Sequence, residues 1–472
     1  MPHVTTRVLT AVLLGLVALT SDSTEAPADR AISAIVGGFV NPGEPGCTVG
    51  VTENGMLSHA LAFGMSDVER GKSLDTHSTF DLASVSKQFT AFALLLLQQQ
   101  GKLSLDDPLV KYMPELAASA DGVTLRHLVH HTGGLRDYIE LIGMRGRTNA
   151  DGSTIHESVQ ALARQTRPNA EPGVEYEYSN TGYLLLGVVI ARVSGQSLAE
   201  FAREQIFRPL GMVSTRIVDR YPDGNATRAR GYANSGKGFV IDETGWEQVG
   251  DGGVHSDLHD LALWDENFYT AKLGGRELIE QMYKVGLLNS GESTGYAAGL
   301  SVDETRGVRL IGHGGSWVGY RSYLLRAPDE HLSVIVLCNR DDADTEDLAN
   351  RVAEVFLKDK LRPATAEADD EAAEEKSAAP GWRPGDLARY AGTYYSPEAI
   401  AQCRLHLRND ALVVEGCAEG AVLKPGKAGE FTDADDSFTL RFPANGSGNG
   451  SFIYNTFGLR ELPFTRVAEQ FE

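Results

Sequence analysis

Ser84 and Lys87 have the residue types and the spacing of a nucleophile and its base. They lie in the segment 81–87, DLASVSK, which runs directly into a long apolar stretch. If a helix begins at Ser84, Lys87 lies one turn further on the same face, and its amine reaches the serine hydroxyl. A hydroxyl becomes a good nucleophile only when a base takes its proton, and a desolvated lysine amine is such a base. The free N–H groups at a helix start also favour a developing oxyanion. The alternative is that Ser84 only caps the helix and Lys87 is a solvated side chain.

A second group of candidates lies in the segment 176–180, YEYSN, between a Glu-Pro-Gly turn and an apolar helix pattern. A phenol at Tyr178 can relay a proton, and the amide of Asn180 can donate to a substrate carbonyl or to Lys87. The alternative makes Tyr178 an aromatic residue at the edge of the core and Asn180 a helix cap.

The third candidate segment is 310–317, LIGHGGSW, between two strand patterns. Its candidate substrate-binding residues are His313, Gly314, Gly315 and Ser316. Glycines at a strand edge let a ligand backbone approach closely and lie along the edge as an added strand. The N–H of Ser316 would then complete an oxyanion hole with that of Ser84. Alternatively, the two glycines only mark a bulge, and His313 is an incidental polar residue.

These three elements, S-x-x-K, Tyr-Ser-Asn and His-Gly-Gly in this order, resemble those of the serine β-lactamase and penicillin-binding protein family. The resemblance is to the branch with class C β-lactamases, DD-carboxypeptidases, D-aminopeptidases and esterases. It implies that Ser84 is the nucleophile and that Lys87 and Tyr178 share the work of general base and proton relay. It also implies that Asn180 positions substrate, that His313 stands on the strand beside the cleft, and that no cofactor is needed.

The resemblance spans about residues 35–358. It includes the segment 128–135, LVHHTGGL, which is similar to the family's H-T-S-G-L segment, and Gly252-Gly253 ahead of a helix pattern. Three histidines in and before the first segment, His127, His130 and His131, are close enough for a metal site, but no H-E-x-x-H motif or matched carboxylate accompanies them. We therefore expect no metal there.

The third element departs from the pattern of class C β-lactamases, which carry Lys-Thr-Gly where this sequence has His313-Gly314-Gly315. A lysine attracts the carboxylate of a β-lactam, whereas a histidine with its ordinary pKa of about 6.5 is mostly neutral at pH 7. Peptidase and esterase members carry a histidine there, so the resemblance favours amide or ester substrates. The alternatives are a class C-like β-lactamase and a penicillin-binding sensor without turnover.

The composition excludes several classes of protein. The chain has 472 residues, of which 42% are hydrophobic and 23% charged, as in ordinary globular proteins. Its 43 basic and 64 acidic residues give a formal charge of −21, which repels phosphate backbones. We expect a small-molecule or short peptide substrate and no nucleic acid.

The N-terminus has the pattern of a signal peptide, residues 1–23. Arg7 precedes an apolar run from Val8 to Leu19, and small polar residues follow at Thr20 to Ser23. We expect export to the periplasm or the medium. No later segment approaches the roughly 20 apolar residues of a membrane helix, so no membrane span is expected.

Apolar periodicity predicts an α/β domain over 35–360, whose antiparallel sheet joins the two ends of the domain. An acidic linker follows at 361–381, then a small all-β domain at 382–472, whose opening LARYAGTY is similar to that of a lipocalin-like β-barrel. The helices are expected at 84–100, 155–165, 183–194, 198–208, 257–269 and 346–358, and the later strands at 296–303, 308–312, 318–326 and 332–338.

The four cysteines divide into two pairs with different expectations. Cys47 and Cys338 lie in apolar strand patterns, which favours buried thiols. Cys403 and Cys417 flank two short strand patterns around Asn409-Asp410, and a hairpin closed there places them about opposite each other, which predicts a disulfide.

Overall fold

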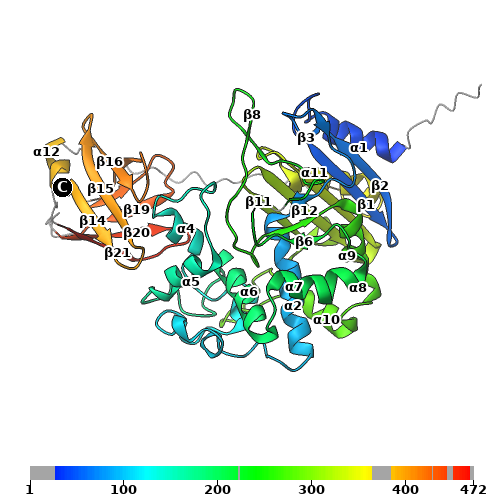
Figure 1. Ribbon diagram of the computed structural model, residues 1–472, viewed down its shortest axis with the longest axis horizontal. Coiled ribbons are helices and arrows are strands. Elements are labelled where there is room, and N and C mark those ends of the chain that lie inside the picture. The colour runs from blue at the N-terminus through cyan, green and yellow to red at the C-terminus, as the bar shows by residue number, and fades with distance from the viewer. Residues whose placement is uncertain (1–26, 222–223, 364–383, 428, 444–449, 468–472) are drawn as a thin grey trace, which may run out of the picture.

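The computed structural model describes residues 27–221, 224–363, 384–427, 429–443 and 450–467. The predicted signal peptide and most of the predicted linker lie outside these residues. Figure 1 shows a large α/β domain and a separate β-barrel beside its helical side.

The α/β domain is built on a six-stranded antiparallel sheet that joins its two ends, as predicted. In spatial order the strands are β10 (Ser301–Thr305), β11 (Val308–Trp317), β12 (Tyr320–Ala327), β13 (Leu332–Cys338), β1 (Cys47–Glu53) and β2 (Met56–Phe63). One face packs against α1 (Pro27–Gly37) and α11 (Thr345–Leu357), and the other packs against α9 (Leu258–Thr270).

A helical region lies beyond α9 and surrounds one central helix, α2 (Lys87–Gln99). This helix packs against α6 (Asn180–Ser194), α7 (Leu198–Ala202) and α10 (Gly275–Met282). Lys87 to Leu97 of α2 are all buried, and from Ala91 to Leu97 every residue is apolar, because this part of the helix is enclosed on all sides. The remaining helices are α3 (Leu125–Val129), α4 (Tyr138–Gly143), α5 (Ile155–Ala163) and α8 (Arg208–Leu210).

Three sets of short strands lie outside the main sheet. They are β3 (Met65–Asp67) with β4 (Lys72–Ser73), the set β5 (Phe80–Asp81), β9 (Val254–Ser256) and β6 (Arg216–Ile217), and β7 (Tyr232–Asn234) with β8 (Phe239–Ile241). Among the described residues no single helix is long and apolar enough to cross a membrane. The two helical segments Asn180–Ser194 and Leu198–Leu210, which meet at a bend of 75°, together have the length and composition of a span, and nothing beyond length and composition supports one.

The C-terminal domain is a closed barrel of eight antiparallel strands. They are β14 (Gly392–Ser396), β15 (Ala401–Arg408), β16 (Ala411–Gly416), β17 (Val422–Pro425), β18 (Glu430–Thr432), β19 (Phe438–Arg441), β20 (Ser451–Thr456) and β21 (Leu462–Arg466). A short helix, α12 (Pro384–Leu387), precedes them. Aromatic rings in mutual contact pack the buried side of the strands, among them Tyr390, Tyr394, Phe431, Phe442 and Phe452.

Three expectations about local structure need correction. The predicted strand at 296–303 begins only at Ser301, because Gly295 and Gly299 adopt left-handed backbone angles, with φ of +68° and +75°. The predicted helix at 198–208 is interrupted by a π-helical turn at Arg203–Phe207. The helix predicted at 183–194 begins at Asn180, because the Ser179 hydroxyl caps it by accepting from the N–H of Gly182.

The prediction of free thiols at Cys47 and Cys338 is wrong, because the two residues form a disulfide. Strands β1 and β13 pair in antiparallel register with Cys47 opposite Cys338, which brings their Cα atoms to 4.0 Å across a sequence separation of 291. The predicted disulfide between Cys403 and Cys417 is present, at the base of the β15–β16 hairpin.

Candidate active site

Ser84 lies on a tight turn between β5 and α2. It belongs to a 3₁₀ turn, Ala83–Ser86, and it is the one residue from Phe80 to Leu97 that is not buried. Ala83 has a φ of +47°, in the left-handed region, and its N–H donates to Oδ1 of Asp81 at 2.8 Å. The turn therefore presents the Ser84 hydroxyl to solvent at the start of an otherwise enclosed helix.

Lys87 is fully buried beneath Ser84 and makes three hydrogen bonds. Its Nζ lies 3.0 Å from Oγ of Ser84, 2.9 Å from Oδ1 of Asn180 and 2.9 Å from the carbonyl oxygen of Asp251. The sequence suggested that the Asn180 amide donates to Lys87; in the structure its oxygen accepts instead. The amine is thus held by side chains and backbone from three separate segments.

Tyr178 stands beside this pair. Its ring centroid lies 4.9 Å from Nζ of Lys87 and 6.0 Å from the ring of His313. Behind it, the ring of His131 packs at 4.4 Å, and Nδ1 of His131 accepts from the N–H of Ser179. His131 also accepts at its carbonyl from the N–H of Glu177, so it holds the backbone on both sides of Tyr178.

The histidine of the third segment is held in its neutral form. Nδ1 of His313 lies 2.6 Å from the carbonyl of Gly314, which can only accept, so Nδ1 carries the proton. Nε2 then accepts from the hydroxyl of Tyr296 at 2.8 Å. Burial, with the nearby charge of Lys87, lowers the pKa of His313 to about 4. This position consequently supplies no positive charge at pH 7.

The edge of β11 beside Ser84 is open. Strand β10 pairs with β11 only as far as Gly312, so residues 313–317 have no strand neighbour on that side within the described part of the chain. A Cβ at Gly315 would lie 2.2 Å from the Leu82 carbonyl oxygen and 2.3 Å from Oγ of Ser322. Glycine at 315 therefore lets the open edge pack directly against the serine turn.

These residues line one cleft of about 700 Å³. Seven of the eight predicted site residues are on its wall: Ser84, Tyr178, Asn180, His313, Gly314, Gly315 and Ser316. The eighth, Lys87, lies beneath Ser84. Aromatic side chains of Tyr138, Trp246 and Trp317 form much of the remaining wall. A cleft that combines apolar walls with a few converging polar groups is typical of small-molecule sites.

Sequence analysis missed several residues of this site; besides the aromatic residues of the wall, they include Asp251 and Tyr296. Asp251 accepts from Lys87 at its carbonyl and from the hydroxyl of Tyr138 at its buried carboxylate, and burial raises the pKa of that carboxylate. Asp251 directly precedes Gly252-Gly253, the signal that could have pointed to it, whereas Tyr296 belongs to no recognisable motif.

The three histidines considered as metal ligands have separate partners. His130 contacts the Tyr296 carbonyl, His131 contacts Ser179, and His127 caps its own helix. Among the described residues no group of three or more metal-ligating side chains comes together.

Known proteins resemble this chain in sequence and in fold. The chain is 33% identical over 318 residues to a penicillin-binding protein of Bacillus subtilis, a match that covers 63% of this chain and 69% of that protein. It is 28% identical over 317 residues to a D-aminopeptidase of Cereibacter sphaeroides, covering 66% of this chain but only 60% of that protein. The octameric penicillin-binding protein homologue from Pyrococcus abyssi shares the fold, with a TM-score of 0.62 and 24% identity over 93% of this chain and 99% of that one.

The α/β domain matches a known protein family over most of its length. Residues 28–357 match the family described as Beta-lactamase, which includes every residue of the cleft described above. This protein therefore belongs to the β-lactamase family.

Proposed function

We propose that this serine hydrolase of the β-lactamase fold cleaves amide or ester bonds through an acyl-enzyme on Ser84, and that its substrates are short peptides or amides of D-amino acids. The observation that carries the proposal is the position of Nζ of Lys87, 3.0 Å from Oγ of Ser84. A hydroxyl and an amine at this distance, in the wall of a cleft, are the parts of an activated nucleophile.

The proposed step needs Lys87 in its neutral form at the moment when Ser84 reacts. A neutral amine has two N–H donors and one lone pair. The Asn180 side-chain oxygen and the Asp251 carbonyl can only accept, so they take the two N–H groups. The lone pair is then left for the proton of Ser84, a reversal of the hydrogen bond in the structure, where Nζ of Lys87 donates to Oγ of Ser84.

The remaining steps use groups at the mouth of the cleft. Ser84 Oγ bonds to the substrate carbonyl carbon, and the oxyanion receives the N–H groups of Ser84 and Ser316. The proton taken by Lys87 passes through the Tyr178 hydroxyl to the leaving nitrogen or oxygen, whose bond to carbon then breaks. Water then attacks the carbonyl carbon of the ester and gives up one proton, which is passed to Oγ of Ser84 as the bond between Oγ and carbon breaks and the acid is released.

Two observations support amides or peptides of D-amino acids as substrates. The neutral His313 offers no cation for a β-lactam carboxylate, and one of the relatives is a D-aminopeptidase. The discriminating assay compares p-nitroanilides of D-alanine and L-alanine, with Ser84→Ala as the control. Release of p-nitroaniline from the D-isomer, lost in Ser84→Ala, is expected. An activity retained within a few-fold in Ser84→Ala would overturn the role of Ser84.

Benzylpenicillin distinguishes the alternatives. The mass of the intact protein is followed over time, together with the products. A Ser84-dependent adduct that vanishes as penicilloate accumulates indicates a class C-like β-lactamase. A lasting adduct, without turnover of any amide or ester, indicates a penicillin-binding sensor.

Export is part of the proposal. Two observations support export: the signal-peptide pattern before Thr20, and the two disulfides. Disulfides persist in oxidising compartments such as the periplasm or the medium. N-terminal sequencing of protein from the periplasm or medium should begin near residues 20–24. Protein found only in the cytoplasm, with Met1 retained or removed alone, would contradict export.

A further inference from the structure

The barrel touches the α/β domain beside the catalytic cleft. The part of the contact nearest the cleft is made by residues 457–461, which connect β20 and β21 and are here called the barrel loop. A cavity of about 230 Å³ has Phe457 and Gly458 of this loop on one wall and Tyr178, Ser179 and Asn180 on another. The loop is therefore a neighbour of the residues placed in the active site.

The barrel loop is attached to the α/β domain by backbone as well as side chains. The Gly458 carbonyl accepts from the N–H of Asp137 at 2.8 Å, and its N–H donates to Glu140 at 3.1 Å. A Cβ at Gly458 would lie 2.6 Å from Cβ of Asp137 and 2.7 Å from Oε1 of Glu140. Only glycine allows this approach without displacement.

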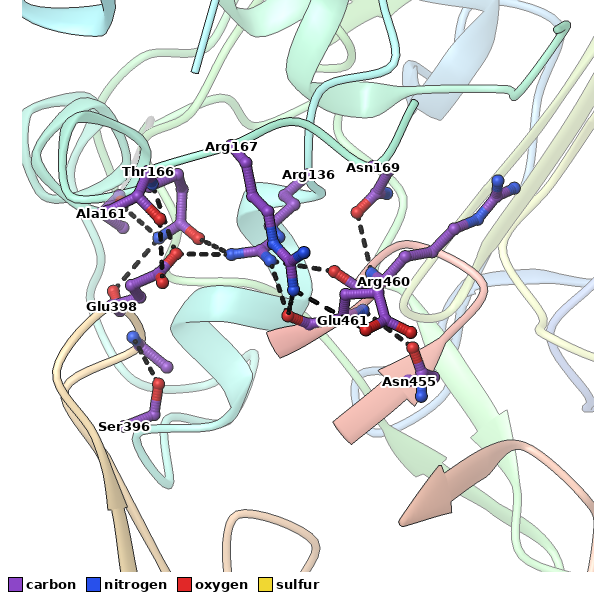
Figure 2. A network of polar contacts seen from close by, with 12 residues as sticks. Arg136, Ala161, Thr166, Arg167, Asn169, Ser396, Glu398, Asn455, Arg460 and Glu461 are labelled. Carbon is purple, nitrogen blue, oxygen red and sulfur yellow. Dashed lines mark hydrogen bonds and ion pairs between the residues drawn. The ribbon is translucent and has the colours of Figure 1, made fainter. Parts of the chain in front are cut away.

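Figure 2 shows how Arg136 anchors the barrel next to the loop. Arg136 is buried, and its guanidinium donates to the Glu398 carboxylate and to the carbonyls of Arg460 and Glu461. The Arg136 carbonyl in turn accepts from the hydroxyl of Thr181, the residue after Asn180. One buried residue thus connects two barrel segments with the start of α6.

Asn169 and Arg460 join the loop to the residue before Tyr178. The Asn169 side-chain NH₂ group donates to the Gly458 carbonyl at 3.0 Å and to Glu177 at 3.1 Å. The side-chain oxygen of Asn169 accepts from the N–H of Arg460, and Figure 2 shows this contact. The guanidinium of Arg460 pairs with Glu175 and, at 3.0 Å, with Glu177. Every polar group of the Asn169 side chain is used in this junction.

Glu177 depends on this junction because its side chain is only 7% exposed. Burial raises its pKa, and the charge of Arg460 opposes that effect. A buried carboxylate without its cation is strongly unfavourable, and the segment that bears it moves toward solvent or another partner. Tyr178 is the next residue and moves with it.

We infer that the barrel completes the active site: its loop, through Arg460 and Asn169, holds Glu177 and thereby positions Tyr178 and Asn180 for catalysis. Arg460 and Glu177 are positioning residues, since their effect passes through Tyr178. The inference rests on the proposed function for the role of Tyr178, but the structural coupling itself does not.

The first test uses Arg460→Gln in the full-length protein, with Arg192→Gln as the matched control. Arg192 pairs with Glu115 at side-chain exposures of 40% and 32%, close to the 38% and 39% of Arg460 and Glu175, and it lies near the far end of α6. Displacement of a catalytic group by about 1 Å costs about 100-fold. We expect Arg460→Gln to lower kcat at least tenfold with KM within threefold, and Arg192→Gln to keep kcat within twofold.

A rescue variant separates positioning from a general loss of stability. Arg460→Gln/Glu177→Gln removes the unpaired carboxylate, while a glutamine at 177 keeps an oxygen for Asn169. Its kcat should exceed that of Arg460→Gln at least threefold. If the double variant is no better than the single one, Glu177 does not transmit the effect, and the inference is overturned.

A second pair of variants perturbs the junction without changing charge. Gly458→Ala introduces the close contacts described above, whereas a Cβ at Gly450, in the same barrel, meets no atom within 4 Å. We expect Gly458→Ala to lower kcat at least tenfold and Gly450→Ala to leave it within twofold. A wild-type kcat in both Gly458→Ala and Arg460→Gln would overturn the inference.

Hydrogen exchange of residues 169–180, followed by mass spectrometry, is the readout independent of activity. Faster exchange in Arg460→Gln than in Arg192→Gln supports the coupling between the barrel loop and this segment. If the wild-type protein also hydrolyses none of the substrates, the proposed function fails while the coupling stands. An active wild type with unchanged kcat and exchange in Arg460→Gln means that the coupling fails and the proposed function stands.

Discussion

Gly315→Ala should damage both stability and activity, whereas the neighbouring Gly314→Ala should be mild. At Gly315 the new methyl group would enter between the Leu82 carbonyl oxygen and Oγ of Ser322, which are joined by a hydrogen bond of 2.7 Å. At Gly314 the methyl group would meet the Tyr323 ring at 3.3 Å and the Ser322 carbonyl oxygen at 3.9 Å. The same chemical change on adjacent residues thus tests two different environments.

The magnitude follows from the overlap. A contact of 2.2 Å between Cβ and a backbone oxygen is about 1 Å shorter than the closest comfortable approach, and the packed interior does not yield by that much without moving backbone. Overpacking of this kind costs about 1–3 kcal/mol. Because the Leu82 carbonyl lies two residues before Ser84, a shift of about 1 Å at the serine turn should lower kcat about 100-fold.

The assay combines urea unfolding with turnover of an activated ester by wild type, Gly314→Ala and Gly315→Ala. We expect a free energy of unfolding lower by about 2 kcal/mol and a kcat lower by about 100-fold in Gly315→Ala. In Gly314→Ala the loss should stay below about 1 kcal/mol, because the Tyr323 ring can move. Equal behaviour of the two variants would refute the claim that the β11 edge packs against the serine turn at Gly315.

Three further predictions concern stability. Burial and the charge of Lys87 hold the pKa of His313 at about 4 in the folded protein, whereas the pKa is about 6.5 in the unfolded chain. As the pH falls from 6.5 to 4, the unfolded chain therefore binds the proton first, and the free energy of unfolding declines. His313→Gln should remove about 3 kcal/mol of that decline, measured by urea unfolding at pH 4 and 7, and an unchanged decline would contradict it. Replacing both Cys47 and Cys338 by alanine should lower the free energy of unfolding by up to about 5 kcal/mol in denaturant titrations, because the disulfide joins residues separated by 291 positions. A loss below about 1 kcal/mol would count against this stabilising role of the disulfide. Arg326→Met should lower the free energy of unfolding by about 3–5 kcal/mol in the same titration, because it leaves the buried Asp265 carboxylate without its cation. Adding Asp265→Asn should recover part of that loss, because it removes the unpaired charge.

Most of the α/β domain could be predicted because its elements follow local rules. Helix α2 is a continuous apolar stretch, and β13 is a run of apolar residues, so each carries its own signal. The antiparallel sheet followed from hairpin-length connections between its strands. Element ends were less predictable: β10 begins late because two glycines shape the turn before it, which the apolar pattern does not reveal.

The disulfide between Cys47 and Cys338 shows where pattern reasoning stops. Each cysteine lies in an apolar run that is equally suited to a buried thiol. Only the pairing of β1 with β13, the first and the last long strands to enter the sheet, places the two side chains opposite each other.

The sequence by itself determined the parts of the site that depend on short spacings. Lys87 lies one helical turn after Ser84, and Gly312, Gly314 and Gly315 flank His313 within four residues, so backbone geometry alone relates the members of each group. Only the tertiary structure decided that Asp251 accepts from Lys87, that the Tyr296 hydroxyl donates to His313, and that the barrel loop contacts the segment bearing Tyr178. These contacts join residues brought together by the packing of separate elements, and packing is a property of the whole chain that no local spacing expresses.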